Sequence, residues 1–481
     1  MFKLAPLSAA IVLALAGQVM ADDSVSTQNQ VGNENIAEVQ QSASPNATAA
    51  QNQTGVGNNH LAVQDFSTSQ IQQTANGQYN AGYAEQIGEQ GSSINQVQRG
   101  SANNTHASQS LGYENQARQA QQGTGNFSFV YQDSQTAAQA TTLQSGQRNE
   151  ANIEQLYSGS DNRALSVQWG NDNFSAAEHI GHENGRIEIY QDGDANWAYG
   201  DQRDGQGGTI GINQNGIGNS VEVWQDTQAD SHTTVTQYGQ VNEAIVDQSF
   251  GSDNTAVLVQ NGQRNATWSD QYETQQSITS ITQDGKDNLH FTYQTGDNHT
   301  LSISTVGNAN KIMASNWKGD KAGGQFGSSQ RAEISQTGVA NSVNLTQDGV
   351  AQLARLNQKG TGNQMQTNQV DSNNELYFEQ NGTDNLLIAD QRGTDNYATG
   401  SSAGSGNTVT LEQSGTGNQS YTWQLYGSGN EATIKQTDGV NVAYVTQGGN
   451  HNQALVDQSG ANMSATISQF GNANMATVLQ Q

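Results

Sequence analysis

The stretch from Gln447 to Gln480 decides the fold. Divided before each repeating glutamine, it reads QGGNHNQALVD, QSGANMSATIS, QFGNANMATVL and a final Q. Each unit has 11 residues; glycine holds the third place, and alanine holds the eighth. Asparagine holds the sixth place in two units, whereas Met463 takes it in the other. A fixed period of this kind indicates a repeat architecture in which each unit is one structural element.

Within a unit the sequence alternates. Ala454, Val456 and Gln458 fall on one side of an extended chain, and Leu455 and Asp457 fall on the other. The segments 149–155, 374–380 and 430–436 follow the same pattern. Alternation over seven residues predicts a half-buried strand, and glycine supplies a positive φ that a turn needs. We therefore predict one strand and one turn per unit, with turn glycines at Gly239, Gly382, Gly449, Gly460 and Gly471.

Composition excludes an ordinary multidomain globular protein. Of 481 residues, only 33% are hydrophobic and 6% aromatic, too few to fill several thick cores. The chain has 53 glycines, and both prolines, Pro6 and Pro45, lie near the start. The long proline-free remainder keeps every main-chain donor that a continuous sheet requires.

The N-terminal segment predicts export. Lys3, an apolar run from Ile11 to Ala16 and the small-residue site Val19–Ala21 fit a cleaved secretory signal over residues 1–21. The chain contains no cysteine, so its stability has to come from the repeat and not from disulfides. A net charge of −27 excludes nucleic acid as the main partner, because a basic surface that could neutralise phosphates is missing.

A second level of order divides the chain. After a short segment at 22–29, residues 30–316 form repeats in roughly 46-residue blocks. Each block opens with a unit in which the glycine and asparagine pattern is absent or incomplete. These units begin at Gln41, Gln86, Gln132, His179, Gln225 and Gln271. Residues 317–335 form an irregular, locally basic insertion, interpreted as a bulged loop, and residues 336–481 carry tandem 11-residue repeats.

These units predict an all-β fold: a β-solenoid of stacked two-strand rungs, with about 22–23 residues per rung, forming a cross-β structure. About 20 rungs spaced ~4.8 Å apart would give a stack roughly 95 Å tall. Inward glutamine and asparagine would stack on themselves as structural amide ladders that satisfy buried polar groups. The expected ladder residues are Gln237, Asn242, Gln248, Gln380, Asn385, Gln391, Gln447, Asn452, Gln458, Gln469, Asn474 and Gln480.

The sequence offers three weak candidates for a chemical site. Asp192-Gly-Asp194 resembles a calcium loop only superficially, because aspartate is not repeated at a fixed place. His179 and His182, three apart on a predicted strand, should lie on opposite faces and not share a metal. Glu375 and Glu379 belong to the repeated outer face, so they predict solvated charge and not a catalytic pair. We expect no catalytic residue, metal or cofactor.

The pattern Gln-x-Gly-x-x-Asn-x-Ala-x-x-x-Gln, from about Gln30 to Gln480, resembles the curlin repeat of bacterial curli fibre subunits. The resemblance implies a secreted, non-enzymatic subunit that polymerises outside the cell as a functional amyloid, in biofilm matrix and adhesion. It also implies self-association at the cell surface and curli-type secretion, chaperone and nucleator proteins as partners.

Two alternatives remain beside the structural fibre: a non-polymerising β-solenoid surface adhesin or fibre nucleator, and, more distantly, an enzyme. A soluble monomer needs capped ends that block its edge strands. Strand motifs run to within one residue of Gln481 and begin near Gln30, which favours open ends and polymerisation.

Overall fold

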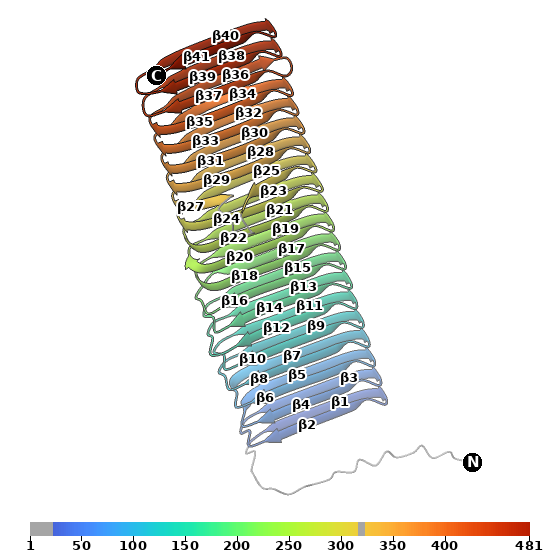
Figure 1. Ribbon diagram of the computed structural model, residues 1–481. Helices are drawn as coiled ribbons and strands as arrows, with labels where there is room; N and C mark the ends of the chain where they lie inside the picture. Colours follow the sequence, from blue (N-terminus) through green and yellow to red (C-terminus); the bar gives the residue numbers. More distant parts are fainter. Residues whose placement is uncertain (1–22, 316–322) are drawn as a thin grey trace, which may run out of the picture.

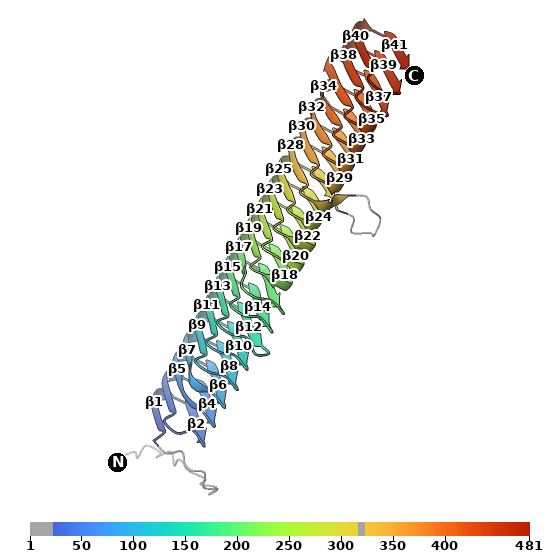
Figure 2. The ribbon, with the colours of Figure 1, turned by 90° about the vertical axis from the view of Figure 1, so that its left-hand side faces the viewer.

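The computed structural model describes residues 23–315 and 323–481, so the predicted signal at 1–21 lies outside the described residues. The described chain coils into a long stack in which each turn adds one strand to each of two sheets (Figure 1). Viewed after a quarter turn, the stack is narrow, with the two sheets back to back (Figure 2). The predicted all-β solenoid with two strands per rung is confirmed.

The first sheet has 20 strands. Its strands are β1 (Val25–Asn33), β3 (Thr48–Val56), β5 (Thr68–Gln78), β7 (Gln90–Ser101), β9 (Gln116–Thr124), β11 (Gln139–Gln147), β13 (Arg163–Asn171), β15 (Arg186–Asp194), β17 (Thr209–Ile217), β19 (His232–Gln240), β21 (Thr255–Gln263), β23 (Ile278–Lys286), β25 (Thr300–Asn308), β28 (Arg331–Val339), β30 (Leu353–Thr361), β32 (Glu375–Thr383), β34 (Tyr397–Ser405), β36 (Gln419–Tyr426), β38 (Val442–Asn450) and β40 (Ser464–Asn472).

The second sheet contains the other strands, of which β26 and β27 share one rung. They are β2 (Ile36–Ser42), β4 (Asn59–Asp65), β6 (Ala81–Ile87), β8 (Asn104–Ser110), β10 (Phe127–Asp133), β12 (Glu150–Leu156), β14 (Phe174–Ile180), β16 (Trp197–Arg203), β18 (Ser220–Ala229), β20 (Glu243–Ser252), β22 (Ala266–Gln275), β24 (Leu289–Asp297), β26 (Lys311–Ala314), β27 (Gly324–Ser328), β29 (Ser342–Val350), β31 (Gln364–Ser372), β33 (Leu386–Thr394), β35 (Thr408–Thr416), β37 (Glu431–Thr437), β39 (Gln453–Ser459) and β41 (Met475–Gln480).

All neighbouring strands pair in parallel and bring equivalent repeat positions together. In the first sheet, Gln237 lies opposite Gln260 and Gly239 opposite Gly262. In the second, Gln248 lies opposite Gln271. The register follows from the period of two, because a slip of one residue would turn every apolar side chain to solvent.

A thin apolar core separates the sheets. Ile187, Ile189 and Ile210 of the first sheet are at most 1% exposed, as are Val221 and Val223 of the second. Burying a side chain of this size stabilises the fold by about 1.5–3 kcal/mol, so each rung adds a similar increment of stability. The N-terminal rungs differ, since buried glutamines take the middle inward position of the first sheet there. These glutamines are Gln51, Gln73, Gln96 and Gln119.

The predicted irregular insertion at 317–335 falls partly outside the described residues. Within it, Gly324–Ser328 forms β27, which pairs with β24 and β29. Arg331 begins β28, which pairs with β25.

Candidate functional site: amide columns and open edges

A column of glutamines runs along the interior of the first sheet. The Nε2 of Gln237 donates to the Oε1 of Gln260 at 2.7 Å, and Gln447 donates to Gln469 at 2.9 Å. Gln358 donates to Gln380 at 2.9 Å, but Gln380 faces Ser402 in the next rung, so the column is interrupted there. Ala75 and Thr305 interrupt it in the same way.

The second sheet carries an equivalent glutamine column. Gln248 donates to Gln271 at 2.7 Å, Gln391 to Gln413 at 2.9 Å, and Gln458 to Gln480 at 2.8 Å. Most of these amides also reach a main-chain carbonyl: the Nε2 of Gln391 donates to Glu375 O at 3.0 Å, and that of Gln458 donates to Val442 O at 3.3 Å. A buried amide therefore finds partners above, below and across the core, which is what its burial requires.

Asparagines form a third column at the corner where each first-sheet strand leads into its second-sheet partner. The Oδ1 of Asn242 accepts from both the main-chain N–H and the Nδ2 of Asn265, each at 3.1 Å. This column has an asparagine in every rung: Asn35, Asn58, Asn80, Asn103, Asn126, Asn149, Asn173, Asn196, Asn219, Asn242, Asn265, Asn288, Asn310, Asn341, Asn363, Asn385, Asn407, Asn430, Asn452 and Asn474. It is the most regular feature of the interior.

A glycine column lies beside the asparagines. Gly239 has a φ of 115°, and a Cβ there would lie 2.0 Å from the carbonyl oxygen of Gly262. Likewise, a Cβ on Gly382 would lie 1.9 Å from the carbonyl oxygen of Gly404, and one on Gly449 would lie 2.0 Å from that of Gly471. These glycines lie inside the first-sheet strands, whereas the chain turns one residue before each asparagine, at a second left-handed residue. The glycines are thus needed for close backbone approach as well as for conformation.

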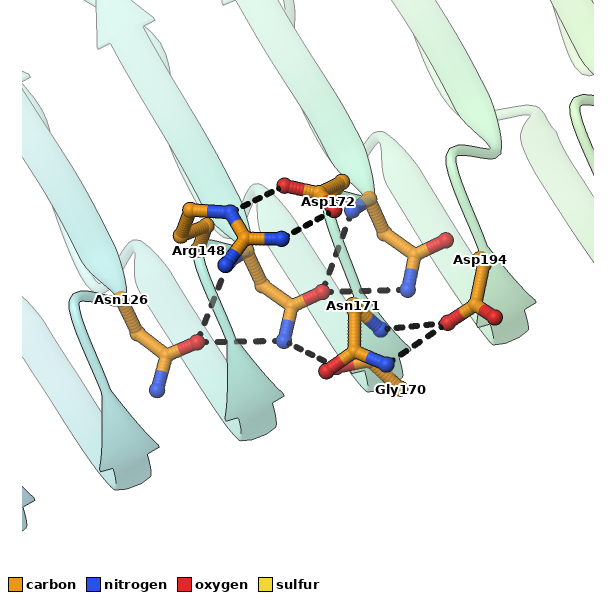
Figure 3. Close-up of polar contacts among 8 residues, drawn as sticks. Asn126, Arg148, Gly170, Asn171, Asp172 and Asp194 are labelled. Carbon is orange, nitrogen blue, oxygen red and sulfur yellow. Dashed lines mark hydrogen bonds and ion pairs between the residues drawn. The ribbon is translucent and has the colours of Figure 1, made fainter.

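Figure 3 shows one stretch of this corner. The column passes from Asn126 through two further asparagines, one of which also donates to Gly170 O at 2.8 Å. Outside it, Arg148 makes two hydrogen bonds to Asp172 of the next rung, at 2.6 and 2.7 Å. The pair is largely exposed, so it adds little to stability. The inner amides, not the outer ions, hold the corner together.

The opposite corner explains the 46-residue period. Large polar side chains point inward there in alternate rungs between residues 89 and 251, and glycine takes the equivalent place in the rungs between. The large side chains are Glu89, Gln135, His182 and Gln228, and the glycines are Gly112, Gly159, Gly205 and Gly251. A Cβ on Gly112 would lie 2.8 Å from Oε1 of Glu89, and one on Gly159 would lie 2.6 Å from Oε1 of Gln135. Each large side chain occupies space that the neighbouring glycine leaves free, so the structural repeat is two rungs. The sequence shows this period but not its cause.

Glu89 is fully buried at this corner. Its carboxylate accepts hydrogen bonds from Ser92 Oγ at 2.5 Å, Gly112 N at 2.8 Å and Asn115 Nδ2 at 3.3 Å. Burial raises the pKa of Glu89, although these donors oppose the shift. The three donors show how the corner accommodates a carboxyl group in the interior.

Buried histidines interrupt the regular interior. His179 takes a place in the second glutamine column, between Gln155 and Gln202. Burial lowers its pKa to about 3, and the charge of His182 adds to the effect. Burial likewise lowers the pKa of His60 to about 4 and that of His290 to about 3.

The expectation that His179 and His182 lie on opposite faces is wrong. Strand β14 ends at Ile180, and the chain turns at Gly181, which has a φ of 59°. His182 therefore also points inward, with its ring centre 6.1 Å from that of His179. In the part of the chain that the structure describes, three His, Cys, Asp or Glu side chains are nowhere arranged to hold a metal ion.

The outer face of the second sheet stacks like charges. Asp247 lies opposite Asp270 in the next strand. Burial raises the pKa of Asp270 to about 7, and the charge of Asp247 adds to the shift. Several outward carboxylates are thus half-buried by their neighbours, so an outward position does not make them fully solvated.

The first and last rungs expose strand edges. All of β1 is exposed, and among the described residues β1 and β2 pair on one side only, with β3 and β4. At the other end β40 and β41 pair on one side with β38 and β39. Asn474 donates to Asn452 at 2.7 Å, and the side chains of Gln469 and Gln480 donate to the main-chain carbonyls of Gln453 and Ser464. Across the described residues, no helix is long and apolar enough to span a membrane.

Comparison with known proteins agrees with this geometry. The family model described as curlin associated repeat matches residues 229–265, 382–415 and 404–437. A search of curated proteins found no match. The matched segments contain Gly239, Gln248, Asn385 and Gln391, which lie in the columns described above. These segments of the chain are thus similar to curlin associated repeats, and they lie within a β-solenoid of about 20 turns.

Proposed function

We propose that this protein is a secreted structural subunit of an extracellular, curli-like amyloid fibre in which copies stack end to end. In this arrangement β40 and β41 of one copy pair with β1 and β2 of the next. The fibre would serve as biofilm matrix and adhesive surface, with curli-type secretion, chaperone and nucleator proteins as partners. The amide columns and the apolar core support a structural, non-enzymatic role.

The match between the two end rungs carries this proposal. Residues 30–41 read QVGNENIAEVQQ, and residues 469–480 read QFGNANMATVLQ. Placed in register, Gln30, Gly32 and Asn35 of one copy meet Gln469, Gly471 and Asn474 of the other. The glutamine columns run from Nε2 to Oε1 in the direction of the C-terminus. Gln469 and Gln480 would therefore donate to Gln30 and Gln41 and continue both columns across the junction.

Charge also favours this junction. The chain has a net charge of −27, yet β1, β40 and β41 contain no acidic or basic residue, and β2 contains one, Glu38. Open strand edges template pairing with another chain. Keeping charge away from these edges reduces the repulsion between copies where they would meet.

The test places charges at the junction without altering the core. Thr27 and Thr466 are exposed, face outward and would lie opposite each other across the junction. The double variant T27K/T466K should polymerise far more slowly than the mature wild type at low salt, because two ammonium groups would stand ~4.8 Å apart. The matched variant T27K/T466E should polymerise like wild type. Sedimentation, dye binding and fibre diffraction measure assembly.

Salt gives a further control, because the Debye length shortens to ~10 Å at 0.1 M and partly screens the repulsion in T27K/T466K. Equal assembly of the two variants would exclude this junction. A wild-type chain that stays monomeric at tens of micromolar, with an intact β spectrum, would favour the surface adhesin instead.

A further inference from the structure

Four aromatic rings form a continuous strip on the outer face of the second sheet. Phe174 stacks on Trp197 with ring centres 5.8 Å apart, and Trp197 lies 6.3 Å from Tyr199. Tyr199 in turn lies 5.9 Å from Trp224. The rings come from β14, β16 and β18, adjacent strands in the middle of the stack (Figure 1). Strands hold these rings in fixed positions, as a binding surface requires.

Carboxylates flank the end of this strip. Because the strands are in register, Trp224 lies between Asp201 of β16 and Asp247 of β20. These three residues, together with Arg203, Gln225, Asp226 and Ser249, line a cavity of about 340 Å³, which we call the Trp224 groove. Three carboxylates face one guanidinium there, so the groove favours a cationic ligand.

Asp201, which lines this groove, has a side-chain oxygen without a hydrogen-bond partner among the described residues. The residue is only 3% exposed, and its Oδ2 accepts hydrogen bonds from Arg203 at 3.0 Å and Tyr199 at 3.4 Å. Its Oδ1 is buried and has no hydrogen-bond partner among the described residues. A buried oxygen without a partner is costly, and a donor supplied by a ligand would remove that cost. Burial also raises the pKa of Asp201 to about 6.

We propose that the Trp224 groove and the aromatic strip bind a linear polysaccharide with free amino groups, such as a glucosamine polymer. The flat C–H faces of the sugar rings would pack on Trp224, Tyr199 and Trp197. An ammonium group would donate to Asp201 and Asp247, and the face of Trp224 would add a cation–π contact. The cavity lies at the small end of ligand sites, which run from ~300 to 1,000 Å³, so it accepts one or two sugar units. Further units would follow the strip.

This inference does not depend on fibre formation, because β16, β18 and β20, whose residues line the groove, lie far from both end rungs (Figure 1). The binding partner is identified by two features together. Aromatic faces without acids would suit a neutral polysaccharide, and acids without aromatic faces would suit any small cation. The combination favours a polymer that carries both apolar sugar faces and positive charge.

Binding of a labelled glucosamine hexamer to the full mature chain tests the proposal, at neutral pH and low salt. W224A should weaken binding about tenfold, and D247N should weaken it several-fold. The fully N-acetylated hexamer has the same sugar faces without the charge, and it should bind at least several-fold more weakly. W224F keeps an aromatic face and should retain most of the affinity, which separates loss of contact from misfolding.

The first sheet provides a matched control. Trp423 of β36 stacks on Tyr421 with ring centres 6.0 Å apart, and it lies between Ser401 and Thr446 and not between carboxylates. W423A removes the same residue type on the opposite face and should leave binding unchanged. Equal losses from W423A and W224A, or equal binding of the acetylated hexamer, would overturn the proposal. A lysine hexapeptide that binds as tightly as the sugar, and equally well to W224A, would also overturn it by showing nonspecific attraction to the acidic chain.

Discussion

Asn242 accepts two hydrogen bonds from Asn265, one from its main-chain N–H and one from its side-chain amide, both at 3.1 Å. The two residues occupy the same place in successive rungs, and each is almost fully buried. The same amide of Asn242 donates to Asn219 and to Gly262 O, each at 3.1 Å. One side chain therefore forms hydrogen bonds that link three successive rungs, so the hydrogen bonds of this corner strengthen one another along the stack.

Replacing Asn242 by alanine should destabilise the solenoid by about 1–3 kcal/mol, because buried groups of Asn265 and Gly262 lose a partner. The midpoint of chemical denaturation of the full chain measures this change. Asn213 is exposed on a first-sheet strand and serves as the control. N213A should change stability by less than about 0.5 kcal/mol, and similar effects of the two variants would contradict the assigned role of the column.

Gly239 should not tolerate alanine. Its positive φ alone would cost about 1–3 kcal/mol, and the new Cβ would also collide with the carbonyl of Gly262. We expect G239A to lower the denaturation midpoint strongly and to disturb the register of adjacent rungs. Gly211 is the control, since a Cβ at that position would lie 3.8 Å from its nearest neighbouring atom. G211A should be neutral or stabilising by up to about 1 kcal/mol, and an equal loss in both variants would be inconsistent with close backbone approach as the cause.

Replacing His179 by glutamine should repair the second glutamine column. Gln155 and Gln202 lie on either side, so the new amide would gain two partners and about 1 kcal/mol. The folded-state pKa of His179 is lowered to about 3 from 6.5. Its neutral form favours folding, so the wild type loses stability as pH falls from 6.5 towards 3. The advantage of H179Q should therefore grow on acidification. Denaturation at a series of pH values checks this, and an advantage that shrinks with acid would be contrary to it.

Asp270 has the opposite pH dependence. Its pKa is raised from 3.8 to about 7 in the folded chain. The folded state holds the proton more tightly, so the wild type loses stability as pH rises from 3.8 to about 7 and then levels off. D270N should match wild type near pH 4 and exceed it increasingly up to pH 7. Asp284 is exposed on β23, and D284N serves as the surface control. Parallel profiles for D270N and wild type would refute the burial of this carboxyl.

The sequence alone determined the 11-residue repeat, the side chains of each strand that point inward, and the β-solenoid architecture. Alternation assigned Ala454, Val456 and Gln458 to the interior, where the structure buries them. The same period predicted stacking of equivalent positions, because only in-register stacking keeps every apolar side chain inside. A regular repeat makes this prediction strong, since each unit repeats the same local preference.

Only the tertiary structure decided which side chains contact one another between successive rungs. The two corners differ: asparagine continues unbroken at one, whereas at the other Glu89 and Gln135 fill space left by Gly112 and Gly159. The sequence could not reveal this difference, because the contacts cross rungs. Likewise, Trp224 meets Asp201 and Asp247 only through the register of three strands. Their separation of 23 residues reflects the summed lengths of strands and turns, and a one-residue change in any turn would place different side chains together.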